Sequence, residues 1–446
     1  MKMPEKPRPF TELFQKAIKV DLITGQKDMQ LVKQYNEEYI HWDELRRKDL
    51  NLDPETIWAF MKLSRISTSK HVAISDISLT YNITNQAQRI MHLLDTGASG
   101  LLVLNEQLKT PEMERYVISS LMEEAIASSQ LEGAVTTTKM AKRMLRENRK
   151  PKTNSEQMIV NDYVTMNRMK ELRDQPLTVA SILELHKLLT NVTLDDPAFE
   201  GRFRIDNETI VGDPLESEKI YHHPPSFDKI QIYMETLCEF ANSDSGENFQ
   251  HPLVKAIIIH FLIGYIHPFI DGNGRLARAL MYWYALKNNY WLFEYMAISK
   301  VIKESKGKYG MSYLYAETDD NAITYFVNYN LISMEKALEN TRQYIRRKQD
   351  EQKDAIRLVK THPELNFRQA EILKDFLKRK GDPISTAEIA SKFNVVRQTA
   401  KTDLVLLESL GLIEKQRIGR TTYFVYSGNS NNKEKNKVPE ISENGG

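Results

Sequence analysis

The segment HPFIDGNGRLAR, which ends at Arg278, gathers side chains that could act together on phosphate groups. Gly272, Asn273 and Gly274 tolerate positive φ angles, and a turn of such residues before a helix can point backbone N–H groups outward to form an anion-binding nest. The dipole of the following helix adds positive potential at the same place. Arg275 and Arg278 would lie in the first turn of that helix, where a cation is unfavourable unless an anion lies nearby. The pattern therefore predicts a phosphate-binding site.

Two further side chains of this segment could supply the chemistry. Asp271 places a carboxylate beside the predicted phosphates, and proteins commonly hold Mg²⁺ between one or two carboxylates and substrate phosphates. His267 places an imidazole next to them, which could take a proton from an attacking hydroxyl group. Each feature alone has an ordinary structural explanation, since short glycine turns, arginines near helix ends and single histidines are common. Their combination in one short segment, in this order, favours a nucleotide site.

The elements that position this segment are two buried helices. The apolar stretch AIIIHFLIGYI belongs to a predicted helix from Leu253 to Ile266, and a second helix is expected from Leu276 to Leu286. The stretch is too short to span a bilayer and contains His260, so we interpret it as a core helix and expect no membrane association. The phosphate site would therefore be a loop between two core helices.

Hydrophobic periodicity divides the chain into five parts. They are a mixed helical and strand segment at 1–95, a helix-rich core at 96–345, a charged connecting helix at 346–365, a compact domain at 366–427 and a disordered tail at 428–446. Within the first two parts, the patterns predict strands at 72–84, helices at 113–130, 154–174 and 179–189, and a hairpin at 201–225 with its turn at 212–214. The charged helix should end before Pro363, because proline disfavours helical conformation in the residue that precedes it.

The composition is that of an ordinary globular protein. The 446 residues carry a formal net charge of +1, so any basic surface for nucleic acid would have to be local. The single cysteine, Cys238, excludes a disulfide within the chain and lies among apolar residues, which indicates a buried thiol. The first residues, MKMPEKPRPF, lack the apolar core of a signal peptide. We therefore expect a cytoplasmic protein.

The phosphate segment also resembles the signature of the Fic family. It matches the pattern His-Pro-Phe-x-Asp/Glu-Gly-Asn-Gly-Arg-x-x-Arg at every fixed position. The resemblance implies a helical core that transfers AMP from ATP to a Ser, Thr or Tyr hydroxyl of a protein. It further implies that His267 is the base, that Asp271 holds Mg²⁺ and that Phe269 is a buried anchor. The glycines and Asn273 would then bind the phosphates, and Arg278 would reach the γ-phosphate.

A second resemblance concerns the helix expected near residues 120–133. The segment SSQLEG, from Ser128 to Gly133, fits the Ser/Thr-x-x-x-Glu-Gly/Asn pattern of the family's self-inhibitory helix. By this resemblance Glu132 would pair with Arg278 and occupy the position of the γ-phosphate. The alternative is an exposed helix end with Gly133 as its C-terminal cap.

Two more segments resemble parts of the family. Residues 203–225, which contain most of the predicted hairpin and the sequence His-Pro-Pro, resemble the flap over the site, where a hairpin edge could bind a target segment as an added strand. A plain surface hairpin is the alternative. Residues 299–309 resemble the helix on the nucleotide side, with Tyr309 as the candidate adenine contact. Lys306 replaces an expected arginine and Gly310 a second tyrosine, which weakens the assignment of adenine contacts.

The last compact part predicts a winged helix-turn-helix domain. Ser385 and Glu388 have the spacing of a capping box at the start of a helix, and a second helix is expected from Val396 to Leu410. Two strands on either side of Gly419 would form a β-ribbon.

DNA is a candidate partner of this last part. The candidate phosphate contacts are Arg397, Lys401, Arg417 and Arg420. Because lysine and arginine barely outnumber aspartate and glutamate here, a protein-interaction or dimerisation module is the alternative.

The leading hypothesis is a mainly α protein with a helical Fic core, a short β-hairpin flap and a C-terminal winged helix-turn-helix domain. It would use ATP and Mg²⁺ to transfer AMP to a hydroxyl of another protein or of itself, and Glu132 would inhibit it. Its partners would be that protein substrate, DNA through the winged helix, and a second copy of the chain in a homodimer.

Three alternatives remain open. The same site could remove AMP, with Glu132 positioning water. The winged helix could act on DNA while the Fic core modifies only the protein itself. A metal-hydrolase site of His260, His267 and Asp271 is a further alternative, but it explains neither arginine.

Overall fold

The computed structural model describes residues 2–19, 26–107, 111–212, 219–243, 249–379, 382–418 and 421–427. The chain divides into two units, and each has a hydrophobic core. Unit 1 comprises Met1–Lys142 and Pro151–Thr341, and unit 2 comprises Arg143–Lys150 and Arg342–Gly446. Helices dominate both units and the strands are short, which confirms the mainly α fold class.

The N-terminal part of unit 1 packs four helices around two tryptophans and adds a hairpin. The helices are α1 (Phe10–Lys19), α2 (Gln26–Glu38), α3 (Trp42–Leu45) and α4 (Pro54–Thr68), and the strands are β1 (Lys70–Ile74) and β2 (Ile77–Tyr81). Trp42 and Trp58 lie in one buried cluster with residues of α1, α2 and α4. The strands predicted at 72–84 are confirmed, because β1 and β2 pair antiparallel with Ile74 opposite Ile77.

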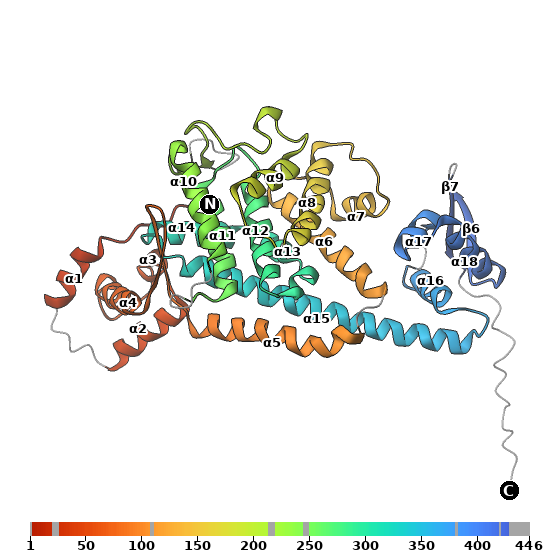
Figure 1. Cartoon of the computed structure of the whole chain (residues 1–446). Helices are drawn as coiled ribbons and strands as arrows, with labels where there is room; N and C mark the ends of the chain where they lie inside the picture. The colour runs from red at the N-terminus through yellow and green to blue at the C-terminus, as the bar shows by residue number, and fades with distance from the viewer. Residues whose placement is uncertain are drawn as a thin grey trace, which may run out of the picture. The chain divides into compact units, whose positions relative to one another are not determined.

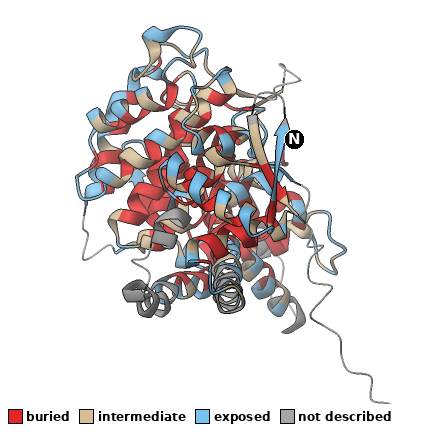
Figure 2. Ribbon diagram, turned by 90° about the vertical axis from the view of Figure 1, so that its right-hand side faces the viewer, coloured by how far each residue is buried: buried red, intermediate tan, exposed pale blue. Residues whose placement is uncertain are grey.

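Two helices form the centre of unit 1 (Figure 1), namely α11 (Pro252–Ile266) and α12 (Asn273–Lys287). Pro252 occupies the first turn of α11, where its missing N–H costs nothing, and the His251 side chain accepts the N–H of Leu253. Almost every residue of α11 is buried, in agreement with its apolar sequence. Figure 2 shows the buried residues concentrated in this centre.

The remaining helices of unit 1 surround this pair. They are α5 (Asn85–Gln107), α6 (Pro111–Leu131), α7 (Thr138–Arg146, whose last residues belong to unit 2), α8 (Asn154–Glu171), α9 (Val179–Thr190), α10 (Ile230–Asn242), α13 (Ile298–Glu304), α14 (Lys306–Thr318) and the start of α15 (Thr324–Thr361), with short 3-10 helices at Pro197–Phe199, Phe227–Lys229 and Trp291–Tyr295. The helices predicted at 113–130, 154–174 and 179–189 correspond to α6, α8 and α9. Threonine side chains cap two of them, since Thr153 accepts the N–H of Glu156 and Thr178 that of Ser181.

The charged stretch after residue 345 belongs to a longer helix than the sequence predicts. Helix α15 begins at Thr324 and continues without a break to Thr361. It ends one residue before His362, as the following proline requires.

The predicted hairpin is present, but its strands are shorter and later in the chain. Strands β3 (Val211–Gly212) and β4 (Ile220–His222) pair antiparallel, whereas residues 203–210 form no strand. Burial of Arg204 gives the physical reason, because its side chain donates hydrogen bonds to the carbonyl groups of His267, Asp206 and Pro225 and so holds this stretch out of a regular ladder. Most of the predicted turn, residues 213 and 214, lies outside the described residues.

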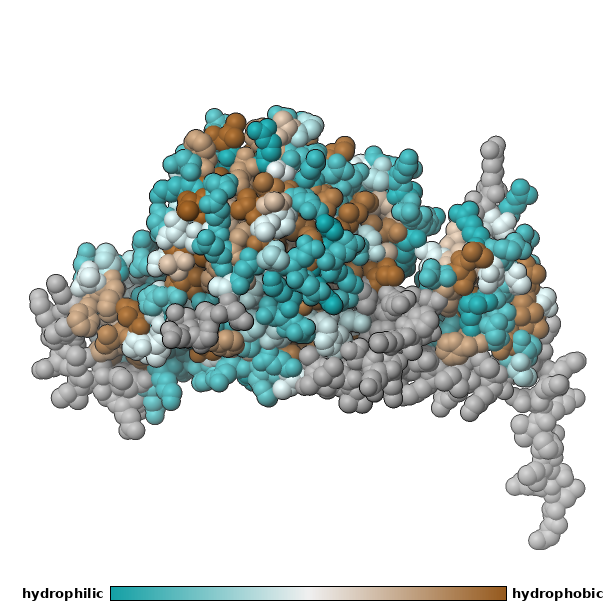
Figure 3. Space-filling view, in the orientation of Figure 1, coloured by the Kyte–Doolittle hydropathy of each residue, from teal (hydrophilic) through white to brown (hydrophobic). Residues whose placement is uncertain are grey.

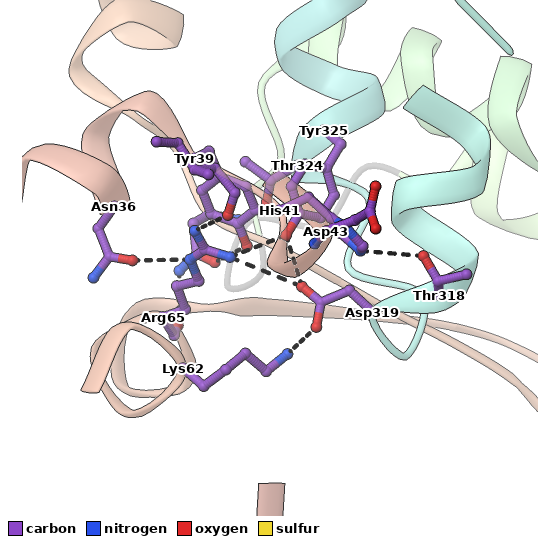
Figure 4. A network of polar contacts seen from close by, with 12 residues as sticks. Asn36, Tyr39, His41, Asp43, Lys62, Arg65, Thr318, Asp319, Thr324 and Tyr325 are labelled. Carbon is purple, nitrogen blue, oxygen red and sulfur yellow. Dashed lines mark hydrogen bonds and ion pairs between the residues drawn. The ribbon is translucent and has the colours of Figure 1, made fainter. Parts of the chain in front are cut away.

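A buried polar network joins the N-terminal helices to the rest of unit 1 (Figure 4). Asp319, at the end of α14, is 0% exposed, and its carboxylate accepts hydrogen bonds from Lys62 at 2.7 Å and from the Tyr325 hydroxyl at 2.9 Å. Arg65 donates to the same hydroxyl at 3.0 Å and lies over the ring of Tyr39, with 3.9 Å between the guanidinium carbon and the ring centre. Because Lys62 and Arg65 both come from α4, the network attaches the N-terminal segment to α14 and α15.

Besides the ends of α7 and α15, the described part of unit 2 contains three helices and a three-stranded sheet. Its elements are α16 (Phe367–Lys378), β5 (Ile384–Ser385), α17 (Thr386–Lys392), α18 (Arg397–Ser409), β6 (Ile413–Ile418) and β7 (Thr421–Tyr426), with the strand order β5-β7-β6. The Ser385 side chain caps α17 by accepting the N–H of Glu388. Helices α17 and α18 and the β6–β7 ribbon follow the order that the sequence predicts. Gly419, Arg420 and the tail at 428–446 lie outside the described residues.

Among the residues with a described position, no helix is both long and apolar enough to cross a bilayer. On the face drawn in Figure 3, hydrophilic residues cover much of the surface and hydrophobic residues occur in small groups. Cys238, on α10, is only 7% exposed. Burial raises the pKa of its thiol to about 12.

Candidate active site

The loop between α11 and α12 is set by two residues with left-handed backbone conformation. His267 ends α11 with φ 49°, and Gly272 precedes α12 with φ 83°. Helix α12 begins at Asn273, three residues earlier than predicted, so that Asn273 and Gly274 are helical and only Gly272 of the three adopts a positive φ. The Asn273 side chain causes this early start, because its amide donates to the Phe269 carbonyl at 2.8 Å and its oxygen accepts the Phe269 N–H at 3.0 Å. Asn273 therefore has its backbone N–H, not its side chain, to offer a phosphate.

His186 supports the loop from α9, and no sequence pattern singles it out. Its ring stacks on the fully buried Phe269 ring, with 3.6 Å between ring centres. Its Nε2 donates to the Asp271 carbonyl at 2.9 Å, and its Nδ1 accepts the Gly201 N–H at 3.1 Å. Burial lowers the pKa of His186 to about 4, so the ring is neutral and can both donate and accept. The sequence does not distinguish a single histidine with such a role from any other residue packed on the buried face of a helix.

His267 is oriented by the last turn of α11. Its Nδ1 lies 3.2 Å from the Gly264 carbonyl oxygen. Because a carbonyl only accepts, Nδ1 carries the hydrogen and Nε2 keeps a lone pair. Burial lowers the pKa of His267 to about 4, with His222 and Arg204 acting in the same direction and Glu132 against it. The imidazole is therefore neutral near physiological pH and can accept a proton at Nε2.

Arg278 and Glu132 meet at this site. Arg278 is 1% exposed, and its Nη1 donates to Glu132 Oε1 at 3.0 Å. Ser128 receives the other two bonds of the guanidinium, from Nε to its hydroxyl at 3.1 Å and from Nη2 to its carbonyl at 2.9 Å. Burial acts to raise the pKa of Glu132, but the charges of Arg278 and Arg275 hold it below its ordinary value. The pair is therefore ionised.

Gly274 lies directly under the Glu132 carboxylate. A Cβ atom at Gly274 would lie 2.2 Å from Glu132 Oε1 and 3.2 Å from Arg278 Nη1. The first turn of α12 and Arg278 therefore enclose the position that the carboxylate occupies. Exposed N–H groups at a helix start, next to an arginine, form a position suited to a phosphate oxygen as well as to a carboxylate oxygen.

Arg275 and Asp271 lie beside this position. Arg275 is fully buried and donates from Nη1 to the Leu189 carbonyl at 2.9 Å, while its Nε and Nη2 have no hydrogen-bond partner. Nη2 is 3.5 Å from the Asp271 carboxylate, whose side chain is 54% exposed and accepts the Gly272 N–H at 2.6 Å. In the described part of the chain, no three His, Cys, Asp or Glu residues form a metal-binding group. One exposed carboxylate is what Mg²⁺ uses when substrate phosphates supply the other ligands, so Asp271 fits that ion.

The residues proposed for the nucleotide side contact other parts of the protein. The Tyr309 hydroxyl is 2.9 Å from His260 Nε2, and its ring packs in an aromatic cluster with Tyr313 and Phe326. Lys306 donates to the Leu131 carbonyl at 2.8 Å, at the end of α6.

Asp162 is a second residue that the sequence did not indicate. It lies on α8, is 1% exposed and accepts a hydrogen bond from Ser129 at 3.2 Å. Burial raises the pKa of Asp162 to about 6, although the charges of Arg275 and Arg278 oppose the increase. It adds a carboxyl group behind the two arginines, and nothing in its sequence neighbourhood distinguishes it from an ordinary helix residue.

Comparison with known proteins agrees with this geometry. Residues 176–285 match the Fic/DOC family. Protein adenylyltransferase Fic of Drosophila erecta is 26% identical over 223 residues, which are 48% of this chain and 42% of the relative. The protein of the same name from Drosophila willistoni is 33% identical over 119 residues, which are 27% of this chain and 21% of the relative. Each match thus spans less than half of the relative's length.

A solved structure shares the fold. The crystal structure of a Fic family protein from Desulfovibrio desulfuricans G20 has a TM-score of 0.51 and 21% identity, and the match covers 78% of this chain and 98% of that chain. The family match includes the loop with His267 and Asp271 and the helix with both arginines. The resemblance of the segment from His267 to Arg278 to the Fic signature is confirmed, and residues 176–285 of this chain match as a Fic domain.

Proposed function

We propose that this protein transfers AMP from ATP to a hydroxyl side chain of a protein, itself included, and that Glu132 restrains the reaction. The observation that carries the proposal is the ion pair of Glu132 and Arg278 over Gly274, within a Fic domain whose relatives are named protein adenylyltransferases. The Glu132 carboxylate bonds to Arg278 at the position where an anionic group of the nucleotide would bind.

Three groups would hold the phosphates of ATP. The backbone N–H groups at the start of α12 donate to phosphate oxygens, and Arg275 has two buried nitrogen atoms without a hydrogen-bond partner. Arg278 binds the terminal phosphate once Glu132 withdraws. Mg²⁺ would be held by Asp271 together with the phosphates, and it would neutralise their charge.

His267 would act as the general base. The hydroxyl oxygen of the target attacks the α-phosphorus of ATP while Nε2 of His267 takes the hydroxyl proton. The new oxygen–phosphorus bond forms as the bond to the leaving pyrophosphate breaks. The hydrogen bond from Nδ1 to the Gly264 carbonyl supports this role, because it leaves the lone pair at Nε2.

Labelling with two forms of ATP tests the proposal. We expect Glu132→Gly to raise self-labelling with α-labelled ATP above that of the wild type, because Arg278 becomes free for the nucleotide. No label should be transferred from γ-labelled ATP. The control is the double variant Glu132→Gly, His267→Ala, which should lose about 10²–10⁴-fold in rate because the base is gone. Transfer of γ-label would contradict the proposal, since it would mean kinase-like chemistry.

Removal of AMP by the same site is a second candidate function. The Glu132 side chain is 31% exposed and its charge acts on His267, so it is placed to orient a water molecule near the base. This function predicts that Glu132→Gly loses activity on an AMP-modified protein instead of gaining labelling. Release of AMP from an AMP-modified protein, compared between the wild type and Glu132→Gly, therefore separates the two.

For unit 2 we propose a winged helix that binds DNA. Support comes from four exposed basic side chains near the predicted DNA-binding elements, namely Arg397 and Lys401 on α18 and Lys415 and Arg417 on β6. Arg397→Ala and Lys401→Ala in the full chain should weaken DNA retardation in a salt-dependent way, because each removes a phosphate contact. Retardation that neither variant changes would favour a protein-interaction module.

A further inference from the structure

His222 connects three segments of unit 1. It lies at the end of strand β4 and is 8% exposed. Its Nδ1 is 2.7 Å from a carboxylate oxygen of Glu317 on α14, and its Nε2 is 2.7 Å from the Tyr265 carbonyl oxygen on α11. The flap, residues 203–225, is thus joined through one side chain to two helices of the core.

Both partners of His222 are acceptors. A carbonyl oxygen only accepts, and an ionised carboxylate also only accepts, so the imidazole has to donate from both nitrogen atoms. This geometry fits the protonated ring, whose hydrogen bonds to Glu317 and Tyr265 are then charge-assisted. A side chain whose two nitrogen atoms are both engaged has none left for a substrate, so its effect must pass through the groups that it holds.

The connection lies next to the proposed base. Tyr265 precedes His267 by two residues in the last turn of α11. From the other side, Arg204 at the start of the flap donates to the His267 carbonyl at 3.0 Å, and its backbone N–H donates to the Pro268 carbonyl at 2.9 Å. The flap is therefore attached to residues 265–268 at two places. His222 bonds to Tyr265, which precedes His267, and Arg204 bonds to the carbonyl groups of His267 and Pro268.

We propose that His222 is a positioning residue, which fixes strand β4 of the flap relative to His267 so that a hydroxyl group presented along the flap reaches Nε2. The inference rests on the proposed AMP transfer. Its geometric basis is that one buried ring, carried by the strand that would present the target, binds the helix end that carries the base.

The test compares His222→Ala with His222→Gln, both combined with Glu132→Gly. The glutamine amide can keep a donor near the position of Nε2, whereas alanine loses both bonds. His92→Ala is the matched control, because it removes an exposed histidine from α5. Two quantities are measured: hydrogen exchange of the amides at 219–223 without nucleotide, and the rate and ATP KM of self-labelling.

We expect His222→Ala to speed amide exchange in the flap by about tenfold or more, because a charge-assisted hydrogen bond is lost. The maximal labelling rate should fall by about 10–100-fold while the KM for ATP stays within about twofold, since the hydroxyl and not the nucleotide is misplaced. His222→Gln should recover part of the rate. His92→Ala should match the Glu132→Gly parent in both quantities.

Several outcomes would overturn the inference: unchanged exchange in the flap, an equal loss in the alanine and glutamine variants, or a rise in ATP KM that accounts for the lower rate. If His222→Ala does not fold, Glu317→Gln replaces it, because that change keeps the acceptor and removes only its charge. Faster flap exchange in Glu317→Gln then supports the inference, and unchanged exchange overturns it. If the Glu132→Gly parent transfers no label, the proposed function fails, and flap exchange alone decides whether His222 holds the flap.

Discussion

At the level of single residues, the site keeps one ionisable side chain neutral and another charged within the same buried surroundings. Burial lowers the pKa of His267 to about 4, which suits a base. Arg278 is buried more deeply but stays charged, because a guanidinium keeps its proton in proteins and this one pairs with the Glu132 carboxylate. The imidazole has a much lower ordinary pKa than the guanidinium, and the partners add to this difference, because the histidine donates to a neutral carbonyl whereas the arginine pairs with an ion.

The pKa of His267 predicts how labelling depends on pH. Protonation removes the base, and the folded-state value lies below the ordinary 6.5, so the rate of Glu132→Gly should stay constant below neutrality and decline only near pH 4. Removal of Glu132 lowers this pKa further, since its negative charge acts to raise it. Initial rates of self-labelling across pH, with circular dichroism as the control for folding, measure the effect. A midpoint near 6.5 would contradict an effect of burial on the base.

The sequence revealed the residues of the signature, because glycines, arginines, a carboxylate and a histidine in fixed order are rare by chance. It did not reveal His186 or Arg204. In the sequence, His186 looks like one more residue on an apolar helix face, and Arg204 looks like an ordinary charged residue of a surface hairpin. Both act through backbone carbonyl groups of the loop, and contacts with carbonyl groups leave no trace in residue types.

At the level of elements, several contacts besides the pair of Glu132 and Arg278 hold helix α6 in place. Buried Glu124 accepts hydrogen bonds from the N–H and hydroxyl of Ser299, at the start of α13. Farther along, Lys303 donates to Gln130, and Lys306 donates to the Leu131 carbonyl. Three of these residues belong to α13 and α14, so any withdrawal of Glu132 that moves the end of α6 has to break its contacts with these helices.

Lys306→Ala should therefore partly release the inhibition. The Leu131 carbonyl at the end of α6 would lose its cationic donor, which costs roughly 0.5–1.5 kcal/mol and should raise self-labelling by a few-fold. Lys308→Ala, an exposed lysine on the same helix, is the matched control and should leave labelling unchanged. An increase as large as that of Glu132→Gly, or none at all, would show that the end of α6 does not move in the way described.

The hairpin shows that an alternating pattern of residues is not sufficient to predict a strand. Alternating residues from 203 to 211 suggested a strand, but the buried side chain of Arg204 connects this stretch to carbonyl groups around the base. Pairing begins only at Val211. The tertiary hydrogen bonds of Arg204 therefore override the local preference for a strand. The residue pattern of one segment does not show such bonds.

At the level of the whole molecule, unit 1 includes the N-terminal helices that the sequence set apart from the core. The hydrogen bond between Lys62 and Asp319 joins residues 257 positions apart. Such long-range partners cannot be paired from one sequence, because many lysines and aspartates could serve. The mixed helical and strand character of this segment was predictable from the sequence, whereas its attachment to α14 and α15 was not.

Asp319→Ala should destabilise unit 1 strongly. It leaves Lys62 and Arg65 without their buried carboxylate, and breaking a buried pair in this way costs about 3–5 kcal/mol. Asp319→Asn keeps the shape and should cost less. Urea unfolding of each variant measures the free energy. Asp320→Asn is the control, because that side chain is 68% exposed and asparagine tolerates its left-handed backbone, so the change should alter the stability by about 0.5 kcal/mol or less. Equal losses at the two positions would contradict the importance of the network.

The buried thiol on α10 makes the protein suited to site-directed fluorescence. The chain has one cysteine, and burial raises the pKa of Cys238 to about 12, so maleimide dyes should react slowly with the native protein. A cysteine introduced at Val135, which is 87% exposed and three residues beyond Glu132, would then be the preferred reactive site. A dye at that position would report movement of the end of α6 when nucleotide is added, while every native side chain of the site stays in place.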